Sequence, residues 1–197
     1  MIGLPDLHWF PKPFGAGDTD GTGAQRVLGQ PDLDLHTLLV RETAQNSWDA
    51  ALPGQVPLFQ LRHRVLDAQT RDVLRWKVLR ESSPDLGLDE ALQATTLTAA
   101  EIVDRRTKGL GGPTRNDIEL SHGSVSDFAA FVLTIGAPPD HQQGGGTYGF
   151  GKTASYSASQ CSTVIIWSRS WDKETQTYIA RFIASAMGPS FSIDAQR

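Results

Sequence analysis

The chain has 197 residues, of which 39% are hydrophobic and 20% are charged, the composition of a globular protein with one well-buried domain. Its formal net charge of -4 gives no support to a strongly basic nucleic-acid surface and leaves only a local patch open. Nowhere does an uninterrupted apolar run reach the length that crossing a bilayer requires.

The first 30 residues are rich in proline, glycine and aspartate and show no apolar periodicity. We therefore expect residues 1–30 to form an extended arm whose aromatic side chains, Trp9, Phe10 and Phe14, dock on the domain or on a partner. Residues 31–197 are expected to form a single domain, and we expect this domain to be the N-terminal module of a longer protein.

A helix is predicted directly after the arm, because Leu35, Leu38 and Leu39 recur at helical spacing and would turn one face inward. Asp32 or Asp34 is expected to cap the N-terminus of this helix. The proline–glycine pair that follows the helical pattern is expected to end it.

Three polar residues, Glu42, Asn46 and Asp49, follow the leucines at intervals of four and then three. On a helix this spacing places them along one stripe, which is expected to continue the leucine face. Buried polar groups without partners are costly, so these side chains either line a cavity that holds a ligand or ion or are paired inside the protein. An ordinary surface helix with a polar end is the alternative.

Two β-prone runs come next, at residues 56–66 and 73–79, and residues 67–70 between them have turn chemistry. We predict an antiparallel hairpin here, with a basic outer face. A solvated face is the favoured explanation, and a nucleic-acid surface is the minority alternative. Residues 86–94 are predicted to form a short helix, and residues 95–103 a strand that runs into Asp104.

The second half of the chain is predicted to begin with a helix over residues 126–135, capped by Ser124 or Ser126. A glycine-rich segment, residues 144–151, leads into a helix over 152–159. Strands at 162–168 and 177–185 follow, joined by a polar turn at 172–175. Helices and antiparallel strands in this order predict an α+β fold with two layers.

The sequence Glu-x-x-x-Asn-x-x-Asp-Ala of the first helix resembles the N-box of the GHKL ATPases, which include gyrase, MutL, MORC proteins, a large heat-shock chaperone and histidine kinases. The resemblance implies a Bergerat-type ATP-binding fold with a mainly antiparallel sheet. It also implies that Asn46 holds Mg²⁺, that Glu42 is the base for the attacking water, and that Asp49 and Ala50 support the nucleotide pocket. Magnesium prefers such oxygen ligands. The residues around Asn46 and after Asp104 are more similar to those of the MutL, MORC and chaperone branch than to those of histidine kinases.

A second motif begins at Asp104, at the end of a predicted strand, and continues into a glycine-containing loop. By the same resemblance, Asp104 accepts the adenine amino group, with Thr107, Gly109 and Gly111 beside the base. The family carries glycine two residues after the aspartate, where this chain has Arg106, so either Arg106 is strained or the turn is built differently. A solvated charged loop is the alternative for this motif.

The third motif is the glycine-rich run that ends in a lysine and resembles the family's second glycine box, the hinge of a lid over residues 112–146. Backbone amides at a helix start bind anions, and a lysine adds charge for the phosphates. The residues implied in nucleotide binding are Gly146, Tyr148, Gly149, Phe150, Gly151, Lys152 and Thr153.

Residues 146–153 also satisfy the P-loop pattern, which is the competing interpretation of the third motif. A P-loop needs an apolar strand directly before it, and residues 137–143 contain two prolines and polar residues that cannot form a central strand. No acidic residue follows the apolar run 163–167 where a second magnesium ligand would be needed.

Together the motifs predict Mg²⁺-dependent ATP binding and hydrolysis, since Glu42 favours attack by water over transfer to a kinase's histidine. Lid closure and self-association on ATP binding are expected, and they would control a partner or downstream domain. A non-hydrolytic ATP sensor is the alternative from another class. A single cysteine, Cys161, excludes an internal disulfide, and without a secretory signal the chain is expected in the cytoplasm, with no membrane partner.

Overall fold

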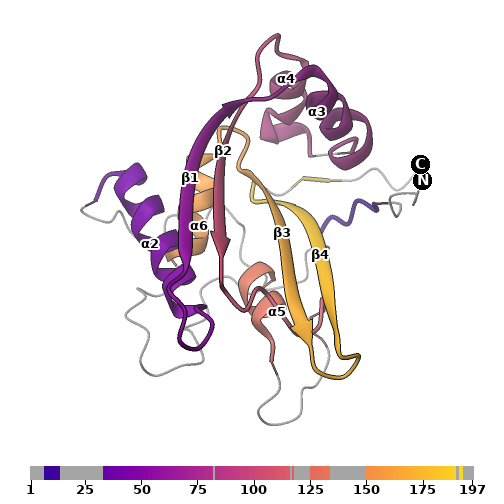
Figure 1. The fold of residues 1–197 in the computed structure, drawn as a ribbon. Coiled ribbons are helices and arrows are strands. Elements are labelled where there is room, and N and C mark those ends of the chain that lie inside the picture. The colour runs from indigo at the N-terminus through magenta and orange to yellow at the C-terminus, as the bar shows by residue number, and fades with distance from the viewer. Residues whose placement is uncertain are drawn as a thin grey trace.

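Four strands in two antiparallel pairs form the centre of the structure (Figure 1). The structure is a computed structural model, and it describes residues 7–13, 33–81, 83–115, 117, 125–133, 150–189 and 191–192. Strand β1 (Leu58–Val65) pairs with β2 (Thr98–Arg105), and β3 (Thr163–Asp172) pairs with β4 (Thr177–Ala186). With the helices described below, the fold belongs to the predicted α+β class.

The β3–β4 hairpin was the most local of the strand predictions, and it is confirmed. Its register places Asp172 opposite Thr177 across the turn. The Asp172 carboxylate accepts hydrogen bonds from the backbone and the hydroxyl of Thr175 at 2.8 and 2.9 Å, which hold the pKa of Asp172 below its ordinary value. A carboxylate that bonds to its own turn in this way favours tight reversal of the chain.

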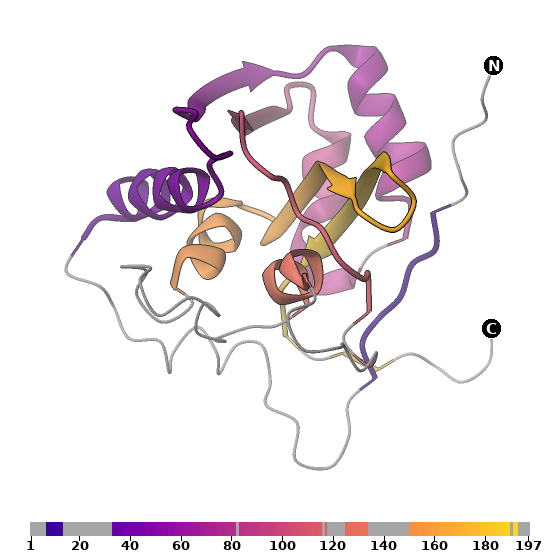
Figure 2. The same ribbon diagram turned by 60° about the horizontal axis from the view of Figure 1, so that its bottom comes forward.

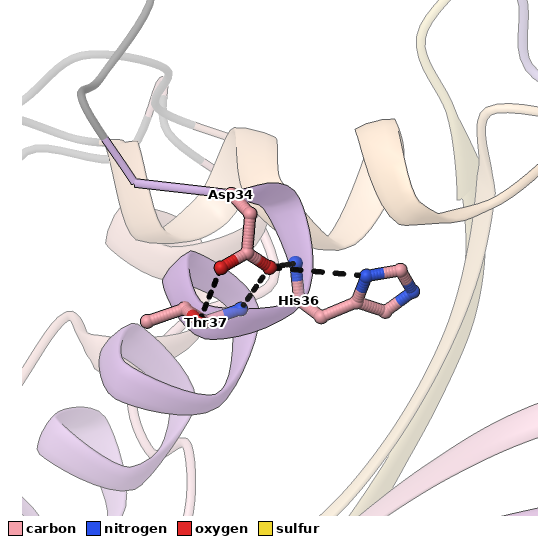
Figure 3. Close-up of polar contacts among 3 residues, drawn as sticks. All are labelled: Asp34, His36 and Thr37. Carbon is pink, nitrogen blue, oxygen red and sulfur yellow. Dashed lines mark hydrogen bonds and ion pairs between the residues drawn. The ribbon is translucent and has the colours of Figure 1, made fainter.

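Helix α2 (Leu35–Asp49) confirms the predicted first helix and is capped by Asp34. The Asp34 carboxylate accepts hydrogen bonds from the backbone N–H groups of His36 and Thr37, both at 3.1 Å, and from the Thr37 hydroxyl (Figure 3). These bonds satisfy helix-start donors that would otherwise have no partner. The same bonds, those from Thr37 first, lower the pKa of Asp34.

The predicted hairpin between residues 56–66 and 73–79 is wrong. Strand β1 lies within its first run, but the chain then forms helix α3 (Ala68–Val73), which continues into a π-helical turn, η1 (Leu74–Val78). Asp67 caps this helix through a 2.7 Å hydrogen bond from the backbone of Thr70. The true partner of β1 is β2, with Leu61 opposite Ile102.

A short 3₁₀ turn, η2 (Pro84–Leu86), leads into helix α4 (Leu88–Gln93), so the helix predicted over residues 86–94 is confirmed with a slightly later start. Its leucines form one apolar cluster with the end of the η1 segment and one side of the β3–β4 hairpin. The members of that cluster are Leu79, Leu86, Leu88 and Leu92, with Leu74, Val78, Leu97, Cys161 and Ala184 packed against them. Cys161 is a half-buried member of this core, and burial raises the pKa of its thiol.

Helix α6 (Phe150–Ala158) lies across both strand pairs and agrees with the helix predicted at 152–159. Its Ala154 packs with Leu38 and Leu39 of α2 and with Ile102 of β2. Its Tyr156 hydroxyl donates a 3.0 Å hydrogen bond to the Ser185 hydroxyl of β4, while burial raises the pKa of Tyr156. The faces that carry Ile102 and Ser185 therefore point to the same side, which we call the inner side.

The helices lie on both sides of the strands. Helices α2, α6 and α5 (Asp127–Val132) lie on the inner side, and the α3–α4 segment lies on the other (Figure 2). Ser126 occupies the N-cap position of α5, but its side chain makes no capping hydrogen bond to the helix. Ser124 and residues 134–135 of the predicted helix fall outside the described residues. No helix within the described ranges has the length and apolar character to cross a membrane.

Part of the predicted N-terminal arm is described, and it contacts the far end of the chain. The Trp9 ring stacks on Phe191 with 5.9 Å between ring centroids. Phe10 beside it is 83% exposed. One aromatic residue of the arm thus contacts a residue of the C-terminal segment, and Phe14 lies outside the described residues.

Candidate functional site

The first two sequence motifs meet where the chain leaves helix α2 and where it leaves strand β2. The backbone N–H of Lys108 donates to the carbonyl of Ala50 at 2.8 Å, and that of Leu52 donates to the carbonyl of Arg106 at 2.9 Å. Ala51 and Thr107 form an isolated antiparallel bridge between these bonds. The C-terminal end of α2 is thereby held beside the loop that begins at Asp104.

Asp104 is the residue through which the two motifs contact each other by side chains. Its Oδ1 accepts a hydrogen bond from the Thr107 hydroxyl at 3.0 Å, and its Oδ2 accepts one from the Ser47 hydroxyl at 3.2 Å. Asp104 itself remains exposed, so one side of the carboxylate is open to a ligand. The arrangement is an acceptor held in place by two hydroxyls.

Ser47 is the site residue that the sequence analysis missed. It is 3% exposed and also lies 3.0 Å from the carbonyl of Thr43, the usual acceptor for a serine inside a helix. Its single hydroxyl proton is therefore shared between Thr43 and Asp104. The available signal was its position beside Asn46, on the face of the helix that turns toward β2.

The predicted polar stripe of α2 is only partly correct. Glu42 lies on the leucine face and is 6% exposed, but Asn46 and Asp49 are both exposed. Asp49 accepts a 2.9 Å hydrogen bond from Gln45 rather than from a residue of another element. In the last turn of α2 the buried residue is instead Ser47, which faces Asp104.

Arg106 stands where the resemblance leads us to expect glycine, and its backbone is strained. Arg106 has φ = 63°, in the left-handed region that costs an L-residue about 1 to 2 kcal/mol and costs glycine little. The bonds on both sides of it, from Leu52 and Lys108, fix this turn. The chain therefore keeps the backbone conformation expected for glycine although an arginine occupies the position.

Arg106→Gly is accordingly expected to raise the free energy of unfolding by up to about 1 kcal/mol, the relieved strain less the extra chain entropy of glycine. Chemical denaturation monitored by circular dichroism measures this change. Arg105→Gly is the matched control, since Arg105 is the last residue of β2 and glycine there is expected to destabilise. A loss of stability in Arg106→Gly equal to that in Arg105→Gly would contradict the assigned strain.

The loop after Asp104 runs along the β3–β4 hairpin and is held there by polar contacts. The backbone N–H of Leu110 donates to the Ser168 hydroxyl at 2.8 Å, and Phe128 of α5 donates its N–H to the carbonyl of Gly111 at 2.8 Å. The Arg181 guanidinium of β4 donates to the carbonyls of Leu110 and Gly112. The loop is thus a packed part of the fold.

Gly109 is the tightest point of this loop. It has φ = 68°, and a Cβ added there would lie 2.2 Å from the carbonyl oxygen of Arg169. Lys108 next to it forms a 3.3 Å ion pair with Asp127 at the start of α5. These contacts hold the segment that carries Thr107, Gly109 and Gly111, the residues implied in base binding, against β3 and α5.

The third motif is described only at its end. Gly146, Tyr148 and Gly149 lie outside the described residues, as does most of the predicted lid. The backbone of Phe150, Gly151 and Lys152 forms the first turn of α6, and Thr153 is 7% exposed within the domain. Helix α6 packs on α2, so the end of the third motif is brought next to the helix of the first.

The P-loop interpretation gains nothing from the described strands. A P-loop follows a strand of a mostly parallel sheet and opens a helix. Both strand pairs in the described part of the chain are antiparallel, and α6 is followed by the first strand of a hairpin.

No protein-family model, curated protein or solved structure matches this chain. A functional assignment therefore depends on the residues and geometry described above.

Proposed function

We propose that this domain binds ATP with Mg²⁺ in a Bergerat-type site and hydrolyses it. The observation that carries the proposal is the contact of Asp104 with Ser47 and Thr107 at 3.2 and 3.0 Å. The contact between Ser47 and Asp104 joins two motifs across 57 residues of sequence, and both motifs resemble parts of one ATP site. An accidental resemblance of two short motifs gives no reason for them to meet.

Asp104 is suited to select adenine. A carboxylate held by two hydroxyl donors keeps a fixed direction, and its remaining lone pairs accept the amino hydrogens of the base. Guanine presents an oxygen at that position, which a carboxylate repels, so a site of this kind discriminates against GTP. Gly109 and Gly111 let the loop that follows Asp104 pack against β3 and Val125, which fixes its position beside the carboxylate.

Asn46 and Glu42 lie one helical turn apart on α2, so their side chains leave the same side of the helix. The exposed amide of Asn46 offers one hard oxygen, which fits an ion that takes one or two protein ligands and completes its shell with phosphates and water. Magnesium would neutralise charge on the triphosphate. Glu42 would accept the proton of the attacking water.

A non-hydrolytic ATP sensor is the second candidate, and the burial of Glu42 favours it. At 6% exposure the carboxylate has little contact with solvent, and a base must lie within hydrogen-bond reach of its water. Hydrolysis would then need a rearrangement around α2 when ATP binds. In the sensor, ATP binding alone changes contacts with a partner or with a second copy of the chain.

Asp104→Asn is expected to weaken ATP binding by about 10- to 100-fold, the usual effect of removing a charged hydrogen-bond partner. Titration calorimetry with ATP and with GTP in the presence of Mg²⁺ measures this change. The preference for ATP over GTP should also narrow, which a general loss of folding would not produce. Asp72→Asn, at an exposed carboxylate on α3, is the control. Wild-type protein that binds no ATP, or an unchanged affinity in Asp104→Asn, would refute the site.

A further inference from the structure

The outer side of the strands, opposite α2 and α6, carries an exposed row of aromatic residues. On β3 and β4 the residues that alternate with the inner Ser170, Arg181 and Ser185 point outward. Four of them are aromatic and exposed, at 64% for Trp167, 47% for Trp171, 60% for Tyr178 and 41% for Phe182. We call these four residues, with Arg169 between the two tryptophans, the aromatic face.

The rings of the aromatic face are ordered by the register of the hairpin. Trp167 is opposite Phe182 and Trp171 is opposite Tyr178, with an edge-to-face contact of 5.1 Å between the centroids of the second pair. The Arg169 guanidinium lies 4.5 Å from the Tyr178 ring centroid. Arg169 and Ala180 stand between the two ring pairs, so the pairs lie about 13 Å apart along the hairpin, four residues at about 3.3 Å each.

Arginines also lie on the outer face of the β1–β2 pair. Ile102 points inward, so Glu101, Val103 and Arg105 of β2 point outward, as do their partners on β1. The charged residues on the outer faces of the four strands are Arg62, Arg64, Arg105, Arg169 and Glu101. Only Glu101 is acidic, and it pairs with Arg64 at 2.6 Å. The β1–β2 pair and the β3–β4 hairpin are separate two-stranded sheets, and the arginines of the first lie on the same outer side as the aromatic face.

The aromatic face is locally positive although the chain has a net charge of -4. Such a face is complementary to an anionic partner that has flat apolar surfaces. We infer that the aromatic face binds single-stranded nucleic acid, with bases stacking on Trp167, Trp171, Tyr178 and Phe182 and phosphates contacting the arginines. Bases stack on exposed aromatics without sequence preference, and arginine adds both phosphate contacts and cation–π contacts. A duplex hides its base faces and is expected to bind more weakly. This inference does not depend on the proposed nucleotide site.

Fluorescence anisotropy with labelled single-stranded DNA and RNA of about 20 nucleotides, longer than the roughly 4 to 16 that one small module covers, tests the inference. The wild-type protein is expected to bind at least one of the two strands more tightly than duplex DNA of the same length. Trp167→Ala and Tyr178→Ala are each expected to weaken binding about fivefold or more. Arg169→Gln is expected to lower the slope of log affinity against log salt by about 0.7.

Trp48→Ala is the matched control, because Trp48 is 63% exposed against 64% for Trp167, but lies on α2 and not on the aromatic face. Far-ultraviolet circular dichroism shows that each variant is folded. Equal affinity in Trp167→Ala, Tyr178→Ala and the control would overturn the inference, and so would the absence of binding to both single strands. Sedimentation that instead shows a wild-type dimer lost in Trp167→Ala, with no oligonucleotide binding, would assign the face to self-association and also overturn it.

Discussion

Glu42→Gln is expected to lower ATP turnover by roughly 10²- to 10⁴-fold, the usual share of a general base, while ATP still binds. Glutamine has nearly the same shape as glutamate, which matters because Glu42 is 6% exposed and a smaller residue leaves a void. Glu42→Ala should show the same loss of turnover together with lower stability. Steady-state phosphate release gives the turnover, and titration calorimetry gives the affinity for ATP.

Glu90→Gln on α4 makes the same chemical change at an exposed position away from the site and should leave turnover unchanged. Wild-type turnover in Glu42→Gln would show that this carboxylate is not the base. A wild-type protein that binds ATP but releases no phosphate would favour the sensor over the hydrolase. These outcomes separate the catalytic role of Glu42 from the binding role of Asp104.

Gly109→Ala is expected to lower the free energy of unfolding by about 2 to 5 kcal/mol. About 1 to 2 kcal/mol comes from a side chain in the left-handed region, and about 1 to 3 kcal/mol from overpacking against the carbonyl of Arg169. The clash is with backbone of β3, at 2.2 Å, so no side-chain rotation relieves it. ATP affinity should fall as well, because the loop that follows Asp104 must move.

Gly54→Ala separates the conformational cost from the cost of overpacking. Gly54 has φ = 70°, nearly the value at Gly109, but no atom lies within 4 Å of the added Cβ. Only the conformational cost of about 1 to 2 kcal/mol is expected there, with no change in ATP affinity. Denaturant unfolding of the two variants gives the difference directly. Equal destabilisation would mean that the loop after Asp104 does not pack on β3.

The error in the strand prediction shows where local patterns mislead. Residues 73–79 contain valines, leucines and a tryptophan that favour a strand by composition. Asp67 was nevertheless a helix cap, bonded to Thr70, and Leu74 and Val78 have the spacing of one helical face. The helical spacing and the cap at Asp67 therefore predict this helix better than residue composition does, but no local pattern predicts the pairing of β1 with β2.

The sequence by itself determined the capped helix α2, the β3–β4 hairpin with its Asp172 turn, and the position of Asp104 near the end of a strand. These features depend on residues within a few positions of one another, so local capping, periodicity and turn chemistry specify them. Only the tertiary structure decided that Leu61 pairs with Ile102, that Ser47 reaches Asp104, and that Glu42 is buried while Asn46 is exposed. Strand pairing and burial arise from packing between distant segments, and no local pattern encodes which segments those are.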